Sequence, residues 1–531
     1  MTVPTRGDDH PKPSAEPARH EDPGLARLAD AILIPPFGGQ AAPGWVLAAL
    51  RHGLGGVTVF GPNIAGPAQL ADLTARLRSA APEPLIAIDE EGGDVTRIGH
   101  LVGSRYPGNA ALGAVDDVAL TRAVYQALGA DLAALGINVD LAPSVDVNTA
   151  ADNPVIGTRS FGADTDLVAR HAAAAVTGLQ AAGVAACAKH FPGHGSTRTD
   201  THDTIATVDV SPRVLAHRDL PPFAAAIAAG VRAVMPGHLR VPQLTGDLPA
   251  SLSPAAQLGL LRGELGFTGV IISDALEMRA VSGPFGIAEA AVLAVAAGTD
   301  LLCFGRDQDE DTYLAVRDAL AAAAASGRIP ARRLEDAAAR VAELRAWTAA
   351  SARDGARAGA FSPPDGADVG LAAARRAVRV FGSLGRPIRR PVLVEVVPPA
   401  NIAVGAVPWG LEPWVPSDSI IRIGVTATAG DHADGQAGDQ AGNQAGDHLA
   451  DADRALAAAA GRPLVVVVRD AHRYPAAREV VTRLLTARPD AVVVEMGLPV
   501  WRPSGGAYVA TYGAAGASGR AAAEVLGLTA S

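Results

Sequence analysis

Short apolar runs alternate with longer segments of helical periodicity from about Leu25 to Thr348. Strands that alternate with helices are typical of βα units around a parallel sheet. Alanine-rich segments between the strands, such as Asp166–Ala182 and Arg213–Ala229, are followed by glycine, as helix ends prefer. The predicted strands are Ala31–Pro36, Gly56–Phe60, Pro84–Asp89, Asn138–Ala142, Ala185–His190, Ala233–Gly237, Gly269–Asp274 and Asp300–Phe304.

Eight such units in about 320 residues predict an α/β fold of the (β/α)8 TIM-barrel type, with the active site at the carboxyl ends of the strands. Polar side chains should collect at those ends. The sequence has such residues at five of the predicted strand ends: Asp89, Glu90 and Glu91 at the third, Lys189 and His190 at the fifth, His238 after the sixth, Asp274 at the seventh, and Arg306 and Asp307 after the eighth. An open, doubly wound sheet is the alternative.

A smaller α/β sandwich domain is predicted after the barrel, because β-branched runs again alternate with alanine-rich helices. These runs are Pro391–Val397, Ile420–Thr426, Pro463–Arg469, Ala491–Met496 and Ala507–Tyr512. We predict a disordered tail over 1–24, the catalytic barrel over 25–348, a linker over 349–370 and the C-terminal domain over 371–531. Residues 429–453 repeat Ala-Gly-Asp and Gln-Ala-Gly units and are expected to form a disordered surface loop.

Composition narrows the possible partners. The chain has 531 residues, 49% of them hydrophobic and 19% charged, with a net charge of -10. An acidic globular chain without a basic patch argues against a nucleic-acid partner. The first residues lack the apolar core of a signal peptide, and no run reaches about 20 apolar residues. We therefore expect a cytoplasmic protein with no membrane partner, whose oligomeric state, monomer or weak dimer, stays open.

The two cysteines, Cys187 and Cys303, each lie in an apolar, strand-like run. Two such residues provide no disulfide framework, and both are expected to be small buried hydrophobic side chains.

The stretch from Ala188 to Asp203 carries the densest chemistry, with three histidines, a lysine and two aspartates. His190, His194 and His202 could bind a metal, but Pro192 prevents the helix that would bring histidines four residues apart onto one face. A loop whose polar groups only satisfy one another is a second interpretation. Catalysis is the favoured one.

Asp200 lies two residues before His202 on this predicted loop. An aspartate so placed can fix the tautomer of the imidazole and leave the other ring nitrogen for proton transfer. We therefore expect His202 to be the acid/base and Asp200 to orient it.

Asp274 is a carboxylate at the end of the apolar run Val270–Ser273, where a barrel would present a nucleophile. The alternative is that Asp274 caps the following helix, because Glu277 three residues later has capping-box spacing.

Lys189 to Gly195, followed by Asp200-Thr201-His202, resembles the signature of the bacterial β-N-acetylglucosaminidases of glycoside hydrolase family 3, whose motif ends in Asp-Ser-His. That resemblance implies that Asp200 and His202 are the acid/base dyad and that Lys189 and His190 bind the sugar. The segment Ser273 to Met278 is similar to the family's nucleophile segment, which implies that Asp274 is the nucleophile.

Two further segments carry the resemblance. Residues 88–97 resemble the family segment Asp-Gln-Glu-Gly-Gly-Arg-Val-x-Arg, which implies that Asp89 binds sugar hydroxyls and Arg97 braces it. Asp94 departs from this pattern because the family usually has arginine there, which leaves the aglycone preference open. Residues 153–162 also match, which implies that Arg159 binds the sugar.

Residues and resemblance together predict a retaining exo-β-N-acetylglucosaminidase acting on small saccharides such as peptidoglycan-derived fragments, with no metal or other cofactor. A phosphorylase that uses the same nucleophile is the nearest alternative, and a β-glucosidase is a further one. Two hypotheses come from other functional classes. One is a zinc amidohydrolase that uses His190, His194 and Asp274, and the other is a non-catalytic sugar-binding protein. His238 is as well explained by packing as by ligand contact.

Overall fold

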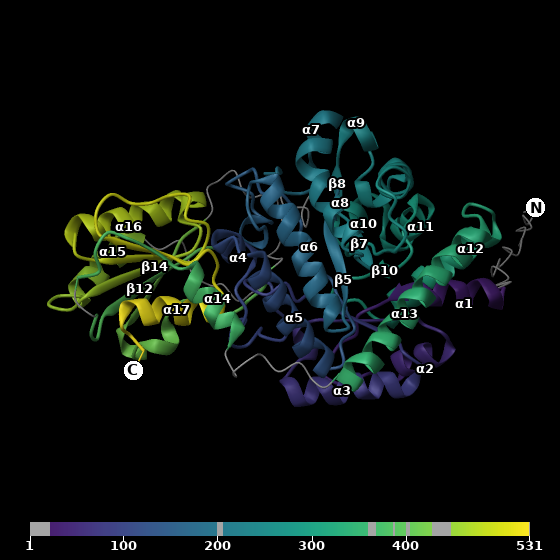
Figure 1. Cartoon of the computed structure of the whole chain (residues 1–531), viewed down its shortest axis with the longest axis horizontal. Coiled ribbons are helices and arrows are strands. Elements are labelled where there is room, and N and C mark those ends of the chain that lie inside the picture. The colour runs from purple at the N-terminus through teal and green to yellow at the C-terminus, as the bar shows by residue number, and fades with distance from the viewer. Residues whose placement is uncertain are drawn as a thin grey trace, which may run out of the picture.

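The computed structural model describes residues 22–198, 205–358, 368–385, 388–399, 404–426 and 448–529. These residues form two lobes that lie side by side (Figure 1). The larger lobe runs from α1 to α13, and the smaller lobe runs from α14 to α17. The predicted tail lies mostly outside the described residues, although α1 already begins at Pro23.

The larger lobe alternates strands and helices as the hydrophobic pattern predicts. Each of the eight predicted strands overlaps an observed one. In chain order the elements are α1 (Pro23–Ala31), β1 (Leu33–Ile34), α2 (Gly44–His52), β2 (Gly56–Val59), α3 (Pro67–Ala80), β3 (Leu85–Ile88), α4 (Asn109–Val115), α5 (Val118–Ala134), β4 (Val139–Asp140), α6 (Thr165–Ala181), β5 (Ala185–Phe191), β6 (Ala206–Thr207), α7 (Pro212–Val214), α8 (Leu220–Ala228), β7 (Ala233–Pro236), β8 (Leu239–Arg240), α9 (Pro242–Thr245), β9 (Val270–Ile271), α10 (Arg279–Phe285), α11 (Ile287–Ala297), β10 (Leu302–Cys303), α12 (Glu310–Ala325) and α13 (Ala331–Ala358).

The central sheet of this lobe is parallel and curled. Its six strands follow the order β2-β3-β4-β5-β7-β9, and β1 pairs with β10 beside it. The N–H of Thr58 on β2 donates to Pro35 O, 3.2 Å away, just after β1. On the other side, Ile272 after β9 bridges to Leu301 before β10. The pair β1–β10 therefore lies between the two edge strands, so the parallel sheet is curled, and the predicted α/β class is confirmed.

Burial explains why these short runs become strands. Every residue of β2, β3, β5 and β7 is buried, as in a parallel sheet covered by helices. Several helices begin where an aspartate accepts a backbone N–H at the N-cap, for example Asp117 before α5 and Asp164 before α6. Because the strands are parallel, their carboxyl ends share one edge of the lobe.

The smaller lobe is a doubly wound α/β unit with the strand order β11-β16-β15-β14-β12-β13. Only the pair β11–β16 is antiparallel. Helices α15 and α16 pack on one face of this sheet and α17 on the other (Figure 1). The elements are α14 (Val369–Ala377), β11 (Arg379–Phe381), β12 (Val392–Val397), β13 (Ile420–Gly424), α15 (His448–Ala458), β14 (Leu464–Val468), α16 (Pro475–Ala487), β15 (Val492–Glu495), β16 (Ala507–Ala510) and α17 (Gly516–Leu526).

The predicted loop 429–453 needs a correction at its end. Residues 448–453 belong to α15, because Ala452 and Ala455 lie three residues apart on one helix face and are buried against the sheet. Residues 429–447 lie outside the described residues. The predicted linker 349–370 is also helical at both ends, where α13 continues to Ala358 and α14 begins at Val369.

The two lobes touch closely where the loop after β3 crosses the start of α17. The N–H of Ala517 in α17 donates to Ser104 O in the loop after β3, at 3.2 Å. Next to it, a Cβ on Gly103 would lie 3.0 Å from the backbone nitrogen of Gly516. Gly103 also has a φ of +83°, which side chains rarely adopt. A glycine therefore lets the loop after β3 contact the N-terminus of α17.

Among the described residues, no single helix is long and apolar enough to cross a membrane, although the bent pair α10 and α11 together meet the criteria of length and composition.

Candidate active site

Lys189, at the carboxyl end of β5, is the centre of a charged cluster. Its Nζ lies 2.7 Å from Asp89 Oδ1 and 2.7 Å from Glu91 Oε1. Burial alone would lower the pKa of Lys189, but the two carboxylates outweigh it and hold that pKa above its usual value. The Asp89 side chain remains 22% exposed. A fixed ammonium beside a partly accessible carboxylate can bind the hydroxyl groups of a polar ligand.

Arg159 enters the same cluster from the single helical turn Gly157–Arg159 after β4. Its Nε and Nη2 donate to the two oxygens of Glu91 at 2.9 and 2.7 Å, a bidentate geometry. Burial would raise the pKa of Glu91, but Arg159 and Lys189 hold it well below its usual value. Glu91 therefore stays ionised and ties two predicted sugar-binding cations together.

His190 is oriented by Asp146, a fully buried aspartate in the loop after β4. His190 Nδ1 lies 2.8 Å from Asp146 Oδ2. Because an ionised carboxylate only accepts, Nδ1 carries the proton and Nε2 can accept from Arg159 Nη2, 3.3 Å away. Burial opposes ionisation of Asp146, but electrostatic attraction to the His190 ring and the hydrogen bond between them hold the pKa of Asp146 below its usual value.

Arg97 lies near Asp89, as the resemblance implied, with Nη2 4.0 Å from Asp89 Oδ2. Its loop is shaped by Glu90, whose Oε2 accepts from the backbone N–H of Arg97 at 2.7 Å and of Ile98 at 3.0 Å. Burial raises the pKa of Glu90 to about 7. The three consecutive acids therefore have different partners: Asp89 faces Lys189 and Arg97, Glu90 holds the loop, and Glu91 binds Arg159 and Lys189.

Asp274 follows β9 on the same carboxyl edge and is partly exposed. Its Oδ1 accepts from the backbone N–H of Ala275 at 2.8 Å. Burial raises the pKa of the Cys187 thiol on β5, and the carboxylates of Asp89 and Asp274 raise it further. Cys187 on β5 lies between β3, which ends just before Asp89, and β9, which ends shortly before Asp274.

His238, at the end of β7, packs behind the Asp274 segment. It is fully buried, with Nε2 2.9 Å from Ala275 O and Nδ1 2.7 Å from Ser251 Oγ. Since Ala275 O only accepts, Nε2 donates to it. These contacts support the packing interpretation of His238.

Asp200 and His202 lie in 199–204, outside the described residues. The residues on either side of this segment are described. Before it, Thr197 Oγ1 lies 2.7 Å from His194 Nδ1. After it, β6 pairs in parallel with β8, which directly follows His238. The residues that flank 199–204 therefore lie at the carboxyl edge that carries Lys189 and Asp274.

Among the described residues, no three His, Cys, Asp or Glu side chains converge as a metal would require. His190 and His194 are neighbours, with ring centroids 5.8 Å apart. Each has its Nδ1 hydrogen-bonded within the protein, to Asp146 and Thr197 respectively. Burial lowers the pKa of His194 to about 4, so it is neutral near pH 7.

Glu91 and Asp146 were not assigned roles from the sequence. Asp146 had a usable signal, because polar Ser144, Asp146 and Asn148 alternate with valines over five residues, the pattern of an extended segment with one polar face. Glu91 was among the polar residues expected at the end of the third strand, but its partners could not be predicted, because three successive acids in an irregular loop cannot be assigned to faces.

A partly accessible carboxylate and a network of fixed charges at one edge of a curled parallel sheet are typical of enzymes that act on polar, hydroxyl-rich substrates. The sequence profile described as Glycosyl hydrolase family 3 N terminal domain matches residues 46–344. The chain therefore belongs to glycoside hydrolase family 3.

Relatives and solved structures agree with this family. A protein named β-hexosaminidase A from Pseudoalteromonas piscicida is 38% identical over 273 residues, which are 47% of this chain and 46% of that protein. The chain thus spans about half the length of that relative. A β-hexosaminidase from Xylella fastidiosa (strain M23) is 40% identical over 46% of this chain and 75% of its own. The solved family 3 β-N-acetylglucosaminidase from Paenibacillus sp. str. FPU-7 is 33% identical, with a TM-score of 0.79 over 95% of this chain and 96% of its own.

Proposed function

We propose that the protein is a retaining exo-β-N-acetylglucosaminidase. The observation that carries this proposal is the Lys189–Asp89–Glu91–Arg159 network at the carboxyl edge of the sheet, with Asp274 two strands away on the same edge. Such a network suits one hydroxyl-rich sugar ring. The names of the β-hexosaminidase relatives and of the Paenibacillus structure support the N-acetylglucosamine specificity. We take the curled sheet to be the TIM-type barrel predicted from the sequence.

In the proposed reaction Asp274 attacks the anomeric carbon and displaces the glycosidic oxygen, which forms a glycosyl-aspartate ester. His202, oriented by Asp200, donates its proton to the departing oxygen. It then takes a proton from water, which attacks the anomeric carbon and releases Asp274. Asp89, Arg97, Lys189, His190 and Arg159 bind the sugar in this scheme. No step needs a metal or other cofactor.

Release of p-nitrophenol from the β-N-acetylglucosaminide and the β-glucoside, with chelator and with or without phosphate, tests this proposal. Faster turnover of the N-acetyl substrate, unchanged by phosphate, is expected. Turnover that rises with phosphate and yields a sugar 1-phosphate would identify a phosphorylase instead. No release of p-nitrophenol, together with chelator-sensitive hydrolysis of the acetamide, would point to the metal-dependent amidohydrolase, and binding of the sugar without either reaction would point to the non-catalytic alternative.

The acid/base role has its own test. His202→Ala is expected to lose far more activity on an unactivated disaccharide than on the p-nitrophenyl glycoside, whose leaving group departs without protonation. Equal losses on both substrates would show that His202 is not the proton donor.

Small peptidoglycan-derived fragments are the proposed natural substrates, and the cytoplasm is the proposed place of action. Incubation with defined N-acetylglucosaminyl disaccharides tests the first, and fractionation of the source cells tests the second.

A further inference from the structure

Asp94 joins the two lobes directly beside the proposed sugar-binding arginine. Its Oδ2 accepts from Thr158 Oγ1 at 2.5 Å and lies 3.2 Å from Arg469 Nη2 in the smaller lobe. Its Oδ1 accepts from the backbone N–H of Ala514, also in the smaller lobe, at 2.8 Å. We propose that the smaller lobe positions Arg159 for sugar binding through Arg469, Asp94 and Thr158. This inference rests on the proposed sugar-binding role of Arg159.

Burial makes the position of Asp94 depend on its partners. The residue is only 6% exposed, and the Arg469 side chain is 14% exposed. A buried carboxylate that loses its cation is strongly destabilised, so Asp94 has one favourable place, between Thr158 and Arg469. The smaller lobe thus contributes a partner to each carboxylate oxygen: Arg469 to Oδ2, which Thr158 also contacts, and the N–H of Ala514 to Oδ1.

The position of Thr158 also limits the position of Arg159. The two residues are consecutive in the turn Gly157–Arg159, where the N–H of Arg159 donates to Ile156 O at 2.8 Å. A tight turn moves as a unit, so holding the Thr158 side chain also holds the Arg159 backbone. The guanidinium of Arg159 then meets Glu91 in a bidentate pair, a geometry that small displacements disturb.

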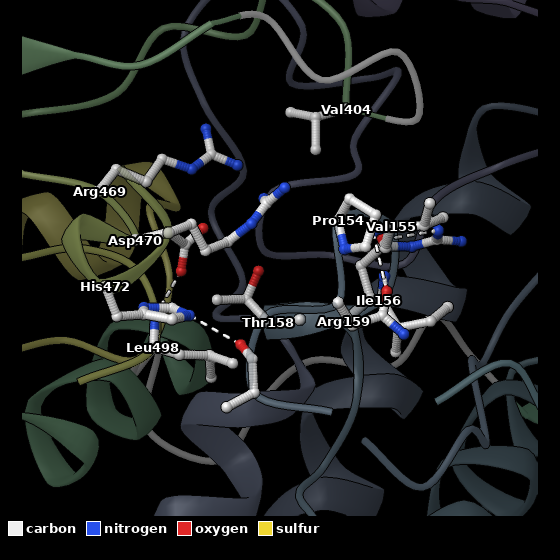
Figure 2. Close-up of a pocket in the computed structure, with 14 residues that line it drawn as sticks. Pro154, Val155, Ile156, Thr158, Arg159, Val404, Arg469, Asp470, His472 and Leu498 are labelled. Atoms are coloured by element: carbon white, nitrogen blue, oxygen red, sulfur yellow. Dashed lines mark hydrogen bonds between the residues drawn. The ribbon is translucent and has the colours of Figure 1, made fainter. Parts of the chain in front are cut away.

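The smaller lobe also contacts the loop before Arg159 at a second place, Ala151. His472 Nε2 donates to Ala151 O at 2.7 Å, and Figure 2 shows this bond. The space between this segment and Arg469 is a cavity of about 20 Å³, room for a single water molecule. Because the lobes are so tightly packed here, the smaller lobe supports the loop at this point and leaves no room for a sugar.

The same contacts explain why the chain departs from the resembled pattern at Asp94. An arginine at this position would face Arg469 across 3.2 Å and could not accept from Thr158 or Ala514. Asp94 and Arg469 therefore form one complementary pair, and neither is expected to contact the substrate.

Kinetics of variants on the p-nitrophenyl β-N-acetylglucosaminide test the proposal in the full-length protein. Arg469→Ala is expected to raise KM, and the Ki of N-acetylglucosamine, about tenfold with less change in kcat. Thr158→Val should give a similar rise. The double variant should be no worse than either single one, because both break the same connection. Arg469→Lys should restore part of the affinity.

Two arginines provide matched controls. Arg473 lies in the same loop, but its guanidinium lies over the ring of its own neighbour Tyr474. Arg376 forms another pair between the lobes, 2.8 Å from Asp117. Arg473→Ala and Arg376→Ala should keep KM and Ki within about twofold of the wild type, because Arg376 belongs to an exposed ion pair that contributes little and Arg473 lies over the ring of Tyr474.

Hydrogen–deuterium exchange provides a readout that needs no turnover. Amides of residues 155–160 should exchange faster in Arg469→Ala than in the wild type and the two controls. Unchanged KM, Ki and exchange in Arg469→Ala would overturn the positioning role, as would equal effects in Arg376→Ala. Faster exchange at 155–160 with no wild-type turnover would instead support the positioning role and reject the proposed function.

Discussion

Both lobes are α/β units whose parallel strands end in polar loops, but the loops differ in what they bind. In the larger lobe the carboxyl edge pairs charges across strands, as Glu91 does with Lys189 and Arg159. In the smaller lobe Glu495, at the end of β15, accepts from the backbone N–H groups of Asp470, Ala471 and Gly497. The first edge leaves Asp89 partly exposed beside these fixed charges, whereas the second organises its own loop, which then contacts the first lobe.

The two buried glutamates differ in charge as well as in partners. Two cations hold the pKa of Glu91 well below its usual value. Burial, reinforced by the charge of Asp470, raises the pKa of Glu495 to about 8. Similar positions at strand ends can therefore hold a permanent anion in one lobe and a carboxyl group that titrates near neutral pH in the other. Four substitutions test this contrast, and we take them in decreasing order of expected effect.

Asp274→Ala should have the largest effect. Loss of the proposed nucleophile should lower kcat by a factor on the order of 10⁴ or more, with the circular dichroism spectrum unchanged. The p-nitrophenyl substrate gives the measurement. A variant that keeps a tenth of wild-type turnover would show that another group is the nucleophile.

Glu91→Gln should have the second-largest effect, because it leaves Lys189 and Arg159 with one ionised partner fewer. We expect a loss of roughly 3 kcal/mol in the free energy of unfolding and a large fall in kcat/KM. Because the folded pKa of Glu91 is depressed, wild type holds this advantage above the ordinary pKa of 4.5 and loses it as pH falls toward the folded pKa.

Thermal unfolding of wild type and Glu91→Gln between pH 3 and pH 7 checks this sign. The difference in Tm should be largest near pH 7 and shrink below about pH 4.5. A difference that grows as the pH falls would mean that Glu91 is protonated in the folded protein.

Asp146→Asn should have an intermediate effect. Asparagine can still hydrogen-bond to His190 Nδ1, but it loses the charge that fixes the tautomer. A roughly ten- to hundredfold fall in kcat/KM is expected, by analogy with partners that orient metal-binding histidines. Thr121→Val, which alters the buried contact to His171 in the same lobe, is the control and should leave kcat/KM near the wild-type value.

Glu495→Gln should have the smallest effect on activity, within about threefold, because Glu495 lies in the supporting lobe. Its stability effect should have the opposite pH dependence to that of Glu91. A raised carboxyl pKa means that wild-type stability falls as pH rises from 4.5 to about 8. The variant lacks this fall, so calorimetry should show its Tm relative to wild type increasing over that range.

The sequence was most informative where periodicity and chemistry coincided. Alternating apolar runs predicted every strand of the curled sheet, and polar residues at their ends pointed to Asp89 and Lys189, which do meet. Contacts between loops could not be predicted, because they depend on the folded path of irregular chain. The partners of Glu91 are of this kind, and so are those of Asp94, since Thr158 and Arg469 are distant from it in the sequence.

The close crossing at Gly103 has a consequence for how this family diversifies. A larger residue there would place its Cβ 3.0 Å from the backbone of Gly516 and would also have to adopt a φ of +83°. A homologue with a larger residue there would have to move the start of α17 by a few tenths of an ångström and hold a strained backbone conformation. Glycine is therefore the residue that lets the loop after β3 and α17 meet here with the least strain.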